Sequence, residues 1–175
     1  MKKIILAGGC FWGLQHFLKT LPGIIKTEVG YANSRIVYPT YQQVCSGATN
    51  ATEAVEVVYD PAAITLAQLL DAYFHVIDPT SVNRQGNDMG TNYRTGIYWT
   101  DEGQVPVIER TLAYWKKVYG RLAVESGKLV NFFPAEDYHQ DYLVKNPEGY
   151  CHISPAKMRS YRLPDVSELA ERGIE

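Results

Sequence analysis

The first third of the chain alternates short apolar runs with turn residues. Residues 3–7 form an apolar run that predicts a short buried strand. The apolar residues of 11–19 are spaced as in a helix, which the Leu-Pro-Gly run at 21–23 would end. A second strand is expected over 24–29. Residues 30–50 are rich in Tyr, Ser, Thr and Asn without a period, which predicts a long surface excursion, and loops of that length are usually functional.

The middle of the chain predicts two strands and two helices. Residues 53–59 are dense in β-branched side chains and precede an Asp-Pro pair, which is typical of a central strand. Residues 65–75 predict a helix capped by Thr65, because apolar residues recur there at helical spacing. The segments that follow are a long loop over 78–92, a strand over 94–99 and an amphipathic helix over 101–119.

The last third predicts edge strands over 121–125 and 128–133 and a short helix over 135–144. After residue 145 the chain contains Pro147, Gly149, Pro155 and Pro164 and has no sustained period, so we expect an irregular, mobile tail. The element order β-α-β-β-α-β matches the split βαβ or ferredoxin-like arrangement. We therefore expect one domain over 1–175 of the α+β class, a two-layer α/β sandwich with helices on one face of a mixed sheet.

Composition narrows the class of protein and its partners. Of the 175 residues, 46% are hydrophobic and 21% charged, as in globular proteins, and the net charge is -2 without a long basic run. Nothing in that balance favours nucleic acid or an anionic membrane surface. The apolar run near the N-terminus is too short for a signal peptide or a membrane span. A cytoplasmic monomer with a small neutral or peptidic substrate fits these features.

Three widely spaced cysteines, Cys10, Cys45 and Cys151, do not resemble a disulfide framework. No Cys-x-x-Cys occurs and the histidines have no metal-ligand spacing, so neither a metal nor another cofactor is expected. The most informative cysteine is Cys10, which lies in Gly-Gly-Cys-Phe-Trp-Gly where a strand turns into a helix. The unpaired N–H groups and macrodipole of a helix start favour a thiolate, and the glycines predict a sulfur open to solvent. A buried structural cysteine is the alternative.

Four segments read together resemble the A-type peptide methionine sulfoxide reductases. They are Gly-Cys-Phe-Trp-Gly at 9–13, Pro-Thr-Tyr-Gln-Gln-Val-Cys-Ser-Gly at 39–47, Gln-Gly-Asn-Asp-Met-Gly-Thr-Asn-Tyr-Arg at 85–94 and Asn-Pro-Glu-Gly-Tyr-Cys at 146–151. The resemblance covers roughly Leu6 to His152, and the joint occurrence of the segments in this order makes chance matching improbable.

The resemblance implies the roles of three catalytic residues. Cys10 would attack the sulfur of methionine S-sulfoxide, free or peptide-bound, and would become a sulfenic acid as methionine leaves. Glu53 would donate the proton that the sulfoxide oxygen needs, with a pKa raised by desolvation, although composition alone favours an exposed strand-end carboxylate. Cys151 would resolve the sulfenic acid as a disulfide, which thioredoxin would reduce.

The resemblance also implies a binding pocket. Phe11 and Trp12 would hold the S-methyl group, whereas Tyr41, Asp88 and Tyr93 would hold the sulfoxide oxygen or orient the groups around it. Each of these side chains has an ordinary structural alternative as a packed ring or a turn residue. The remaining cysteine, Cys45, has no implied role and is expected to be buried.

The chain departs from the pattern in three places. Ala51-Thr52 stands where His-Ala is usual, Tyr38-Pro39 stands where Asn-Pro is usual, and the C-terminal region has one cysteine where some members have two. The first two changes would alter the pocket rim. The third leaves no further thiol for a disulfide relay.

Three other functions are compatible with parts of the pattern. A cysteine hydrolase could use Cys10, His139 and Asp141 as nucleophile, base and orienting group. A thiol peroxidase is chemically closer, but two aromatic residues suit a methyl sulfoxide better than hydrogen peroxide. A small-ligand-binding domain would require Cys10 to be inert.

Overall fold

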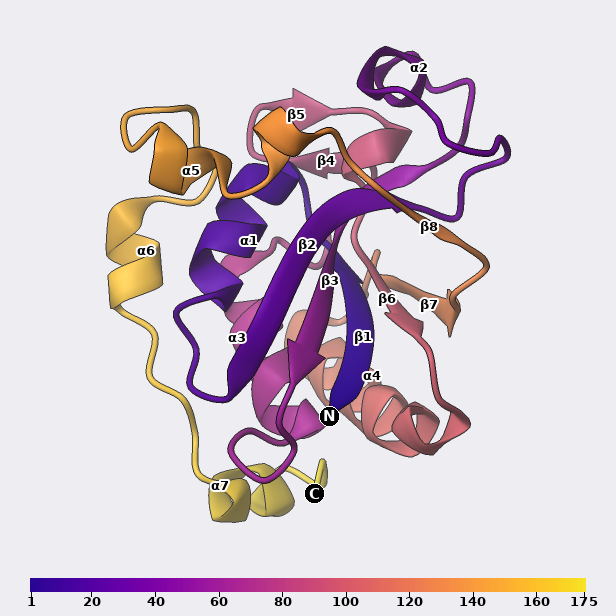
Figure 1. The fold of residues 1–175 in the computed structure, drawn as a ribbon. Helices are drawn as coiled ribbons and strands as arrows, with labels where there is room; N and C mark the ends of the chain where they lie inside the picture. Colours follow the sequence, from indigo (N-terminus) through magenta and orange to yellow (C-terminus); the bar gives the residue numbers. More distant parts are fainter.

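A six-stranded mixed sheet forms the centre of the protein, whose computed structural model describes residues 1–175 (Figure 1). Its strand order is β7-β6-β1-β3-β2-β8, and only the β6–β7 pair is parallel. The strands are β1 (Lys2–Ala7), β2 (Ile24–Ala32), β3 (Thr52–Tyr59), β6 (Gly96–Trp99), β7 (Glu125–Lys128) and β8 (Phe132–Pro134). A separate hairpin joins β4 (Arg84–Gln85) to β5 (Asp88–Met89).

Three helices cover one face of the sheet: α1 (Phe11–Leu18), α3 (Leu66–Val76) and α4 (Val105–Tyr119) (Figure 1). The main core lies between them and the sheet. In β1, Ile4 and Leu6 enter that core, whereas Ile5 and Ala7 belong to a smaller cluster on the opposite face. Because both faces of β1 are buried there, its sequence is a continuous apolar run rather than an alternating one.

Identifiable residues begin and end the two long predicted helices. The side chain of Thr65 accepts from the backbone N–H of Gln68, and the Gln68 side chain bonds back, which confirms the predicted cap of α3. The predicted helix over 101–119 is confirmed as α4, preceded by the short 3-10 helix η2 (Glu102–Gln104). Gly120 ends α4 in the left-handed region, at φ 80°.

The two predicted loops contain regular structure. The segment over 30–50 includes the end of β2 and the helix α2 (Tyr41–Cys45), which extends beyond the sheet in Figure 1. The segment over 78–92 contains the β4–β5 hairpin and leads into the 3-10 helix η1 (Thr91–Tyr93). Both segments carry residues on which the family resemblance is based, and both are ordered.

The predicted helix over 135–144 is wrong. In its place are the 3-10 helix η3 (Asp137–His139) and the short helix α5 (Tyr142–Lys145). Between them, the Gln140 side chain accepts from the N–H of Val29 and donates to the C=O of Val29. This pairing with the end of the sheet, together with Asp141 at φ 51°, interrupts a continuous helix.

The predicted irregular tail is also wrong. It contains α6 (Pro155–Arg159) and α7 (Val166–Glu171), and Leu169 and Ile174 are buried against α3 and α4. The predicted edge strands lie further along the chain than expected, as β7 and β8. The C-terminal part of the tail therefore packs against the rest of the protein, so the segment around Cys151 is held at both ends.

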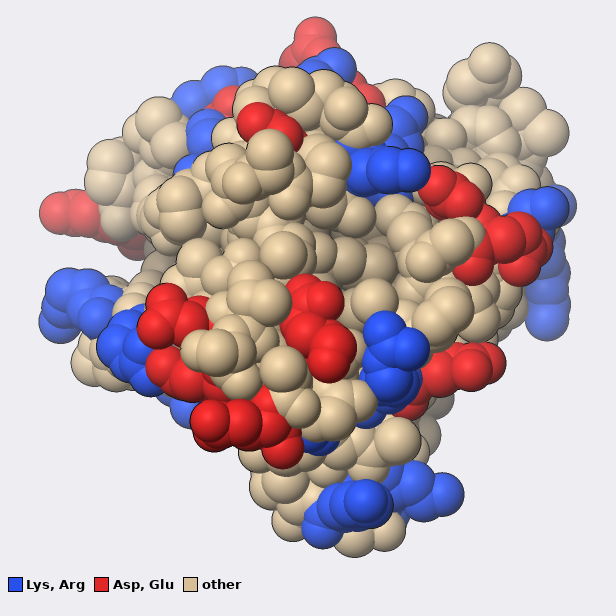
Figure 2. All heavy atoms as spheres, turned by 90° about the horizontal axis from the view of Figure 1, so that it is seen from below, with Lys and Arg blue, Asp and Glu red and all other residues tan.

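The surface mixes both signs of charge. On the face in Figure 2, blue Lys and Arg side chains are interspersed with red Asp and Glu side chains. None of the helices is long and apolar enough to cross a membrane.

Candidate active site

Cys10 lies at the junction of β1 and α1, as the sequence predicts, and is the N-cap residue of α1. Gly9 before it has φ 78°, and a Cβ there would lie 2.7 Å from Cβ of Gln85. Only glycine fits both the backbone conformation and this close approach. The expectation of an open sulfur is wrong in this state, because Cys10 is 7% exposed.

The electrostatics of Cys10 also differ from the expectation of a favoured thiolate. Burial and the charge of Glu53 raise the pKa of the Cys10 thiol, and a backbone hydrogen bond from Trp12 only partly opposes them. The helix start does supply an N–H donor, but desolvation of the sulfur outweighs it. Without substrate, Cys10 is therefore a protonated thiol at neutral pH.

Glu53 is the acidic group beside Cys10. It is 1% exposed on β3, so the alternative of an exposed strand-end carboxylate is wrong. Its Oε1 accepts from the N–H of Phe11 at 3.3 Å, the first residue of the helix that Cys10 caps. Burial raises the pKa of Glu53 to about 8 despite this hydrogen bond, so the group carries a proton at pH 7.

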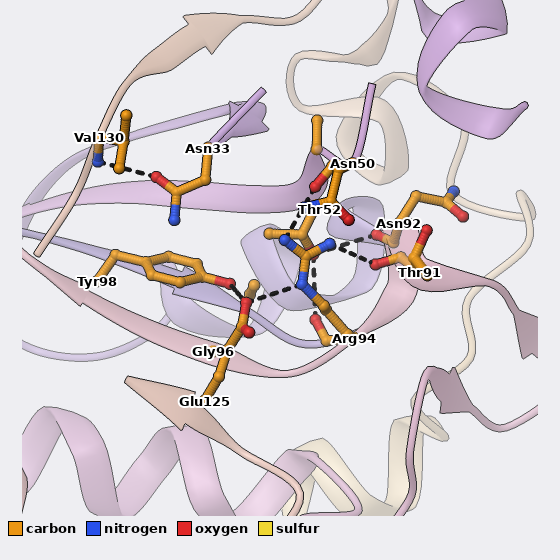
Figure 3. A network of polar contacts seen from close by, with 12 residues as sticks. Asn33, Asn50, Thr52, Thr91, Asn92, Arg94, Gly96, Tyr98, Glu125 and Val130 are labelled. Atoms are coloured by element: carbon orange, nitrogen blue, oxygen red, sulfur yellow. Dashed lines mark hydrogen bonds and ion pairs between the residues drawn. The ribbon is translucent and has the colours of Figure 1, made fainter. Parts of the chain in front are cut away.

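Asn92 is the second donor to Glu53, and its position depends on a polar network (Figure 3). Its Nδ2 donates to Glu53 Oε2 at 3.4 Å. The Thr52 hydroxyl donates to the backbone C=O groups of Asn92 and Arg94. The Arg94 guanidinium donates to the C=O groups of Thr91 and Asn50 and pairs with Glu125 at 2.8 Å. Thr52, one of the departures from the family pattern, thus helps to position η1.

Phe11 and Trp12 begin a group of stacked aromatic rings. Trp12 stacks on Tyr142 with ring centroids 3.7 Å apart, and its indole Nε1 donates to Nδ1 of His139 at 2.9 Å. Phe11 is buried against His139, with centroids 5.2 Å apart. These contacts fix the two rings that the family resemblance assigns to the S-methyl group.

Tyr41 and Tyr93 approach Glu53 from two different elements. Tyr41 begins α2, and its backbone N–H donates to Glu136 Oε2 at 3.0 Å. Burial and the charge of Glu53 raise the pKa of both phenols. Phenols are protonated at neutral pH, so both hydroxyls can donate, and both lie within electrostatic range of Glu53; a hydrogen bond with Cys45 also acts on Tyr41. Cys45 follows on α2 and is exposed, so its predicted burial is wrong.

Asp88 connects the β4–β5 hairpin to the segment that carries Cys151. Its Oδ2 accepts from the Tyr150 hydroxyl at 3.0 Å. Its charge raises the pKa of Glu53 and that of Cys10, which places Asp88 within electrostatic range of both. Asp88 thus bonds to the residue before Cys151 and lies within electrostatic range of the acid and the thiol.

Cys151 lies against the first turn of α1. A Cβ added at Gly13 would come within 2.9 Å of Cys151 Sγ, so the absence of a side chain at Gly13 makes room for the second thiol. The thiol donates to the C=O of Ile153, and Cys151 also lines a pocket of about 370 Å³ together with Leu143 and Met158. All three cysteines are free.

The family resemblance implies release of methionine followed by a Cys10–Cys151 disulfide, and we predict that Gly13→Ala slows formation of that disulfide at least tenfold without a comparable effect on the initial release. The added methyl group would displace Cys151, whereas Cys10 and Glu53 keep their places. Rapid mixing of reduced protein with methionine sulfoxide, with thiol counting over time, measures both steps. Gly127→Ala is the control, because a Cβ there meets nothing within 4 Å. Parent-like disulfide formation in Gly13→Ala would contradict this account of Gly13.

The structure does not assemble the hydrolase triad. Nδ1 of His139 accepts from Trp12, while Asp141 pairs with Lys19 at 2.5 Å. His139 therefore has no orienting carboxylate in Asp141. Burial also lowers the pKa of His139, as expected for a neutral imidazole that accepts from an indole.

Two free thiols at one helix start, one of them beside a protonated carboxyl group, define a thiol-dependent oxidoreductase. The sequence model of the family described as "Peptide methionine sulfoxide reductase" matches residues 2–168. The chain belongs to this family, whose members reduce methionine sulfoxide.

Individual relatives agree with this assignment. A peptide methionine sulfoxide reductase MsrA of Mycoplasma genitalium is 54% identical over 154 residues, which is 87% of this chain and 98% of the relative. Mxr1 of Saccharomyces cerevisiae in reduced form superimposes with a TM-score of 0.83 at 36% identity, over 87% of this chain and 91% of Mxr1. Mxr1 in complex with Trx2 matches with a TM-score of 0.58 at 25% identity, over 81% and 84% of the two chains.

Sequence reasoning missed several residues that hold the predicted ones in place. Asn92 and Tyr150 lie inside the quoted segments, so their position beside Glu53 and Asp88 could have been suspected. Glu136 and His139 lie in the segment predicted as one helix, and nothing in that pattern indicated their contacts with Tyr41 and Trp12.

Proposed function

We propose that Cys10, Glu53 and Cys151 carry out the reduction of methionine S-sulfoxide, free or peptide-bound, by this chain. The main support is that the buried acid accepts a hydrogen bond from the residue that follows Cys10, so proton donor and nucleophile meet at one helix start. The family assignment shows an oxidoreductase rather than a binding domain, which supports a reactive Cys10.

The first half-reaction uses the two protons that burial keeps in the site. Glu53 protonates the sulfoxide oxygen as Cys10 sulfur attacks the sulfoxide sulfur, and the resulting carboxylate accepts the Cys10 thiol proton. Methionine leaves with two electrons, and Cys10 holds the oxygen as a sulfenic acid. The raised pKa of Cys10 is compatible with this chemistry, because the base forms next to the thiol at the moment of attack.

The pocket residues have distinct tasks. Phe11 and Trp12 surround the S-methyl group with apolar surface, and the orientation of Trp12 depends on Tyr142 and His139. Tyr41 and Tyr93 donate to the sulfoxide oxygen, because a phenol is a protonated donor at neutral pH. Asp88 holds the Tyr150 hydroxyl and so aligns the segment that carries Cys151.

The second half-reaction forms the Cys10–Cys151 disulfide and releases water. The location of Cys151 against Gly13 supports this role, since Gly13 lies three residues from Cys10 on α1. Thioredoxin then reduces the disulfide. The complex of Mxr1 with Trx2 supports a protein reductant, and the pocket beside Cys151 supports attack on that sulfur. No cofactor enters the scheme.

We predict that Cys151→Ser reduces about one equivalent of methionine sulfoxide and then stalls with thioredoxin, because the sulfenic acid has no second thiol. Mass measurement of the reacted parent should show a bond between Cys10 and Cys151. Cys45→Ser is the matched control and should turn over like the parent, since Cys45 is exposed on α2. Turnover of Cys151→Ser with thioredoxin at the parent rate would remove Cys151 from this role.

We also propose that the inner strands form a split βαβ, ferredoxin-like core within one domain over 1–175. Their order β6-β1-β3-β2 supports this, with β3 inserted antiparallel between β1 and β2. The buried residues of α7 support including the tail in the same domain. The reducing cytoplasm remains the expected compartment, because the cysteines are unpaired and the reductant is a dithiol.

A further inference from the structure

His152 follows Cys151 directly and has no role in the scheme above. Both of its ring nitrogens are shielded from solvent, and no side chain hydrogen-bonds to either of them; the ring interacts only with the backbone of Gly8. A polar ring that is placed inward with so few partners costs stability, so such a side chain calls for a functional explanation.

The imidazole ring lies against Gly9 and Gly13, the two glycines on either side of the segment from Cys10 to Trp12. A Cβ at Gly9 would lie 2.9 Å from Nε2 of His152, and a Cβ at Gly13 would lie 3.4 Å from Nδ1. The same Cβ at Gly13 would lie 2.9 Å from Cys151 Sγ. One nitrogen therefore lies on the Cys151 side of the ring, and the other lies beside the residue that precedes Cys10.

Burial favours the neutral form of His152, and the charge near it does not reverse this. Burial lowers the pKa of His152, while the charge of Asp88 and the backbone of Gly8 oppose this shift. Asp88 is the charged group that faces the ring from the hairpin, and Cys10 and Cys151 are the titratable groups on the adjoining elements. A neutral imidazole has one nitrogen that accepts a proton and one that donates.

Disulfide formation requires such a group. Cys151 must lose its proton to attack, but burial raises the pKa of its thiol, and the S–H donates to the Ile153 carbonyl, which cannot take the proton away. The sulfenic acid on Cys10 must in turn lose hydroxide, which needs a proton to leave as water.

We propose that His152 accepts the proton of the Cys151 thiol and supplies a proton to the hydroxide that leaves Cys10. In this step the S–S bond forms, the S–O bond of the sulfenic acid breaks, one water is released and the imidazole ends neutral. The inference rests on the proposed function, because it concerns the second half-reaction of the same site.

The test separates the two half-reactions in single-turnover mixing of reduced protein with methionine sulfoxide across pH 5 to 9. Methionine release reports the first half, and loss of the sulfenic acid by quenched mass measurement reports the second. His152→Gln keeps the side-chain size but cannot relay a proton. His75→Gln is the histidine control, because His75 lies on α3 and contacts Lys157 and Tyr161.

In His152→Gln, methionine release should equal that of the parent, while disulfide formation should slow about 100-fold at pH 7. The deficit should shrink about tenfold per pH unit as hydroxide replaces the imidazole, so the variant approaches the parent at high pH. Added imidazole should restore disulfide formation in His152→Ala, which confirms proton transfer even where the glutamine variant is poorly folded.

Four results would decide against the idea or against its basis. Equal disulfide rates at every pH, or a deficit that does not change with pH, would overturn the proton-transfer role, and the second pattern would make His152 a structural residue. Absence of imidazole rescue in a folded His152→Ala would do the same. Absence of methionine release in the parent protein would instead overturn the proposed function.

Discussion

Cys10→Ser should abolish methionine sulfoxide reduction while leaving the fold intact. A serine hydroxyl cannot accept the sulfoxide oxygen as the cysteine sulfur does when it becomes a sulfenic acid. The first step of the scheme therefore cannot occur. Serine is also a preferred N-cap residue, and the Cys10 side chain makes no capping hydrogen bond that the change would remove. We expect a loss of more than about 10⁴-fold in methionine release and a thermal midpoint equal to or above that of the parent.

The measurement is methionine release from a peptide sulfoxide by protein at stoichiometric concentration, so that one turnover would be detected. Cys45→Ser controls for the loss of a thiol as such, because Cys45 is the other cysteine near the site and has no assigned step. Release of one equivalent by Cys10→Ser would assign the attack to another sulfur and would overturn the scheme.

The order of strands and helices was largely predictable because local patterns decide it. The structure has three such patterns where the sequence indicates them: the apolar run of β1, the cap at Thr65 and the amphipathic stretch of α4. The helix over 135–144 failed because Gln140 bonds the backbone of Val29, a partner 111 residues away. Contacts of that separation leave no trace in local periodicity.

The tail was mispredicted for a related reason. The segments of α6 and α7 are short, and their prolines suggest irregular structure, yet Ser154 caps α6 and Leu169 packs against Ala67. Proline at the first turn of a helix is compatible with the helix, and this reading of Pro155 was available from the sequence. The packing of Leu169 was not.

The state of Cys10 could not be predicted from the residues around it. The sequence shows a helix start, which favours the thiolate, but it does not show that the sulfur is 7% exposed or that Glu53 lies beside it. These two features raise the pKa of Cys10 and outweigh the helix start. The burial of Glu53 was predictable only through the family resemblance, because composition alone favours an exposed carboxylate.

Glu53→Gln should lower methionine release about 10²- to 10⁴-fold at pH 7, because the amide has no proton to give. In the parent, release should fall as pH rises through about 8, where the Glu53 carboxyl group ionises. The variant should lack this limb. A pH profile of single-turnover methionine release measures both, and parent-like release by Glu53→Gln at pH 7 would show that the sulfoxide oxygen obtains its proton elsewhere.

The same substitution should stabilise the protein at alkaline pH. Between the ordinary carboxyl pKa near 4.5 and the raised value of about 8, folded Glu53 binds a proton that the unfolded chain has released. The free energy of unfolding of the parent therefore falls across this window as pH rises, and remains lower above pH 8. Glu53→Gln removes this penalty, so urea unfolding should show a gain on the order of 4 kcal/mol at pH 9 relative to pH 5. A parent stability that does not change between pH 5 and pH 8 relative to the variant would mean that the buried group is already a carboxylate there, and the proton donor would then have to be Tyr41 or Tyr93.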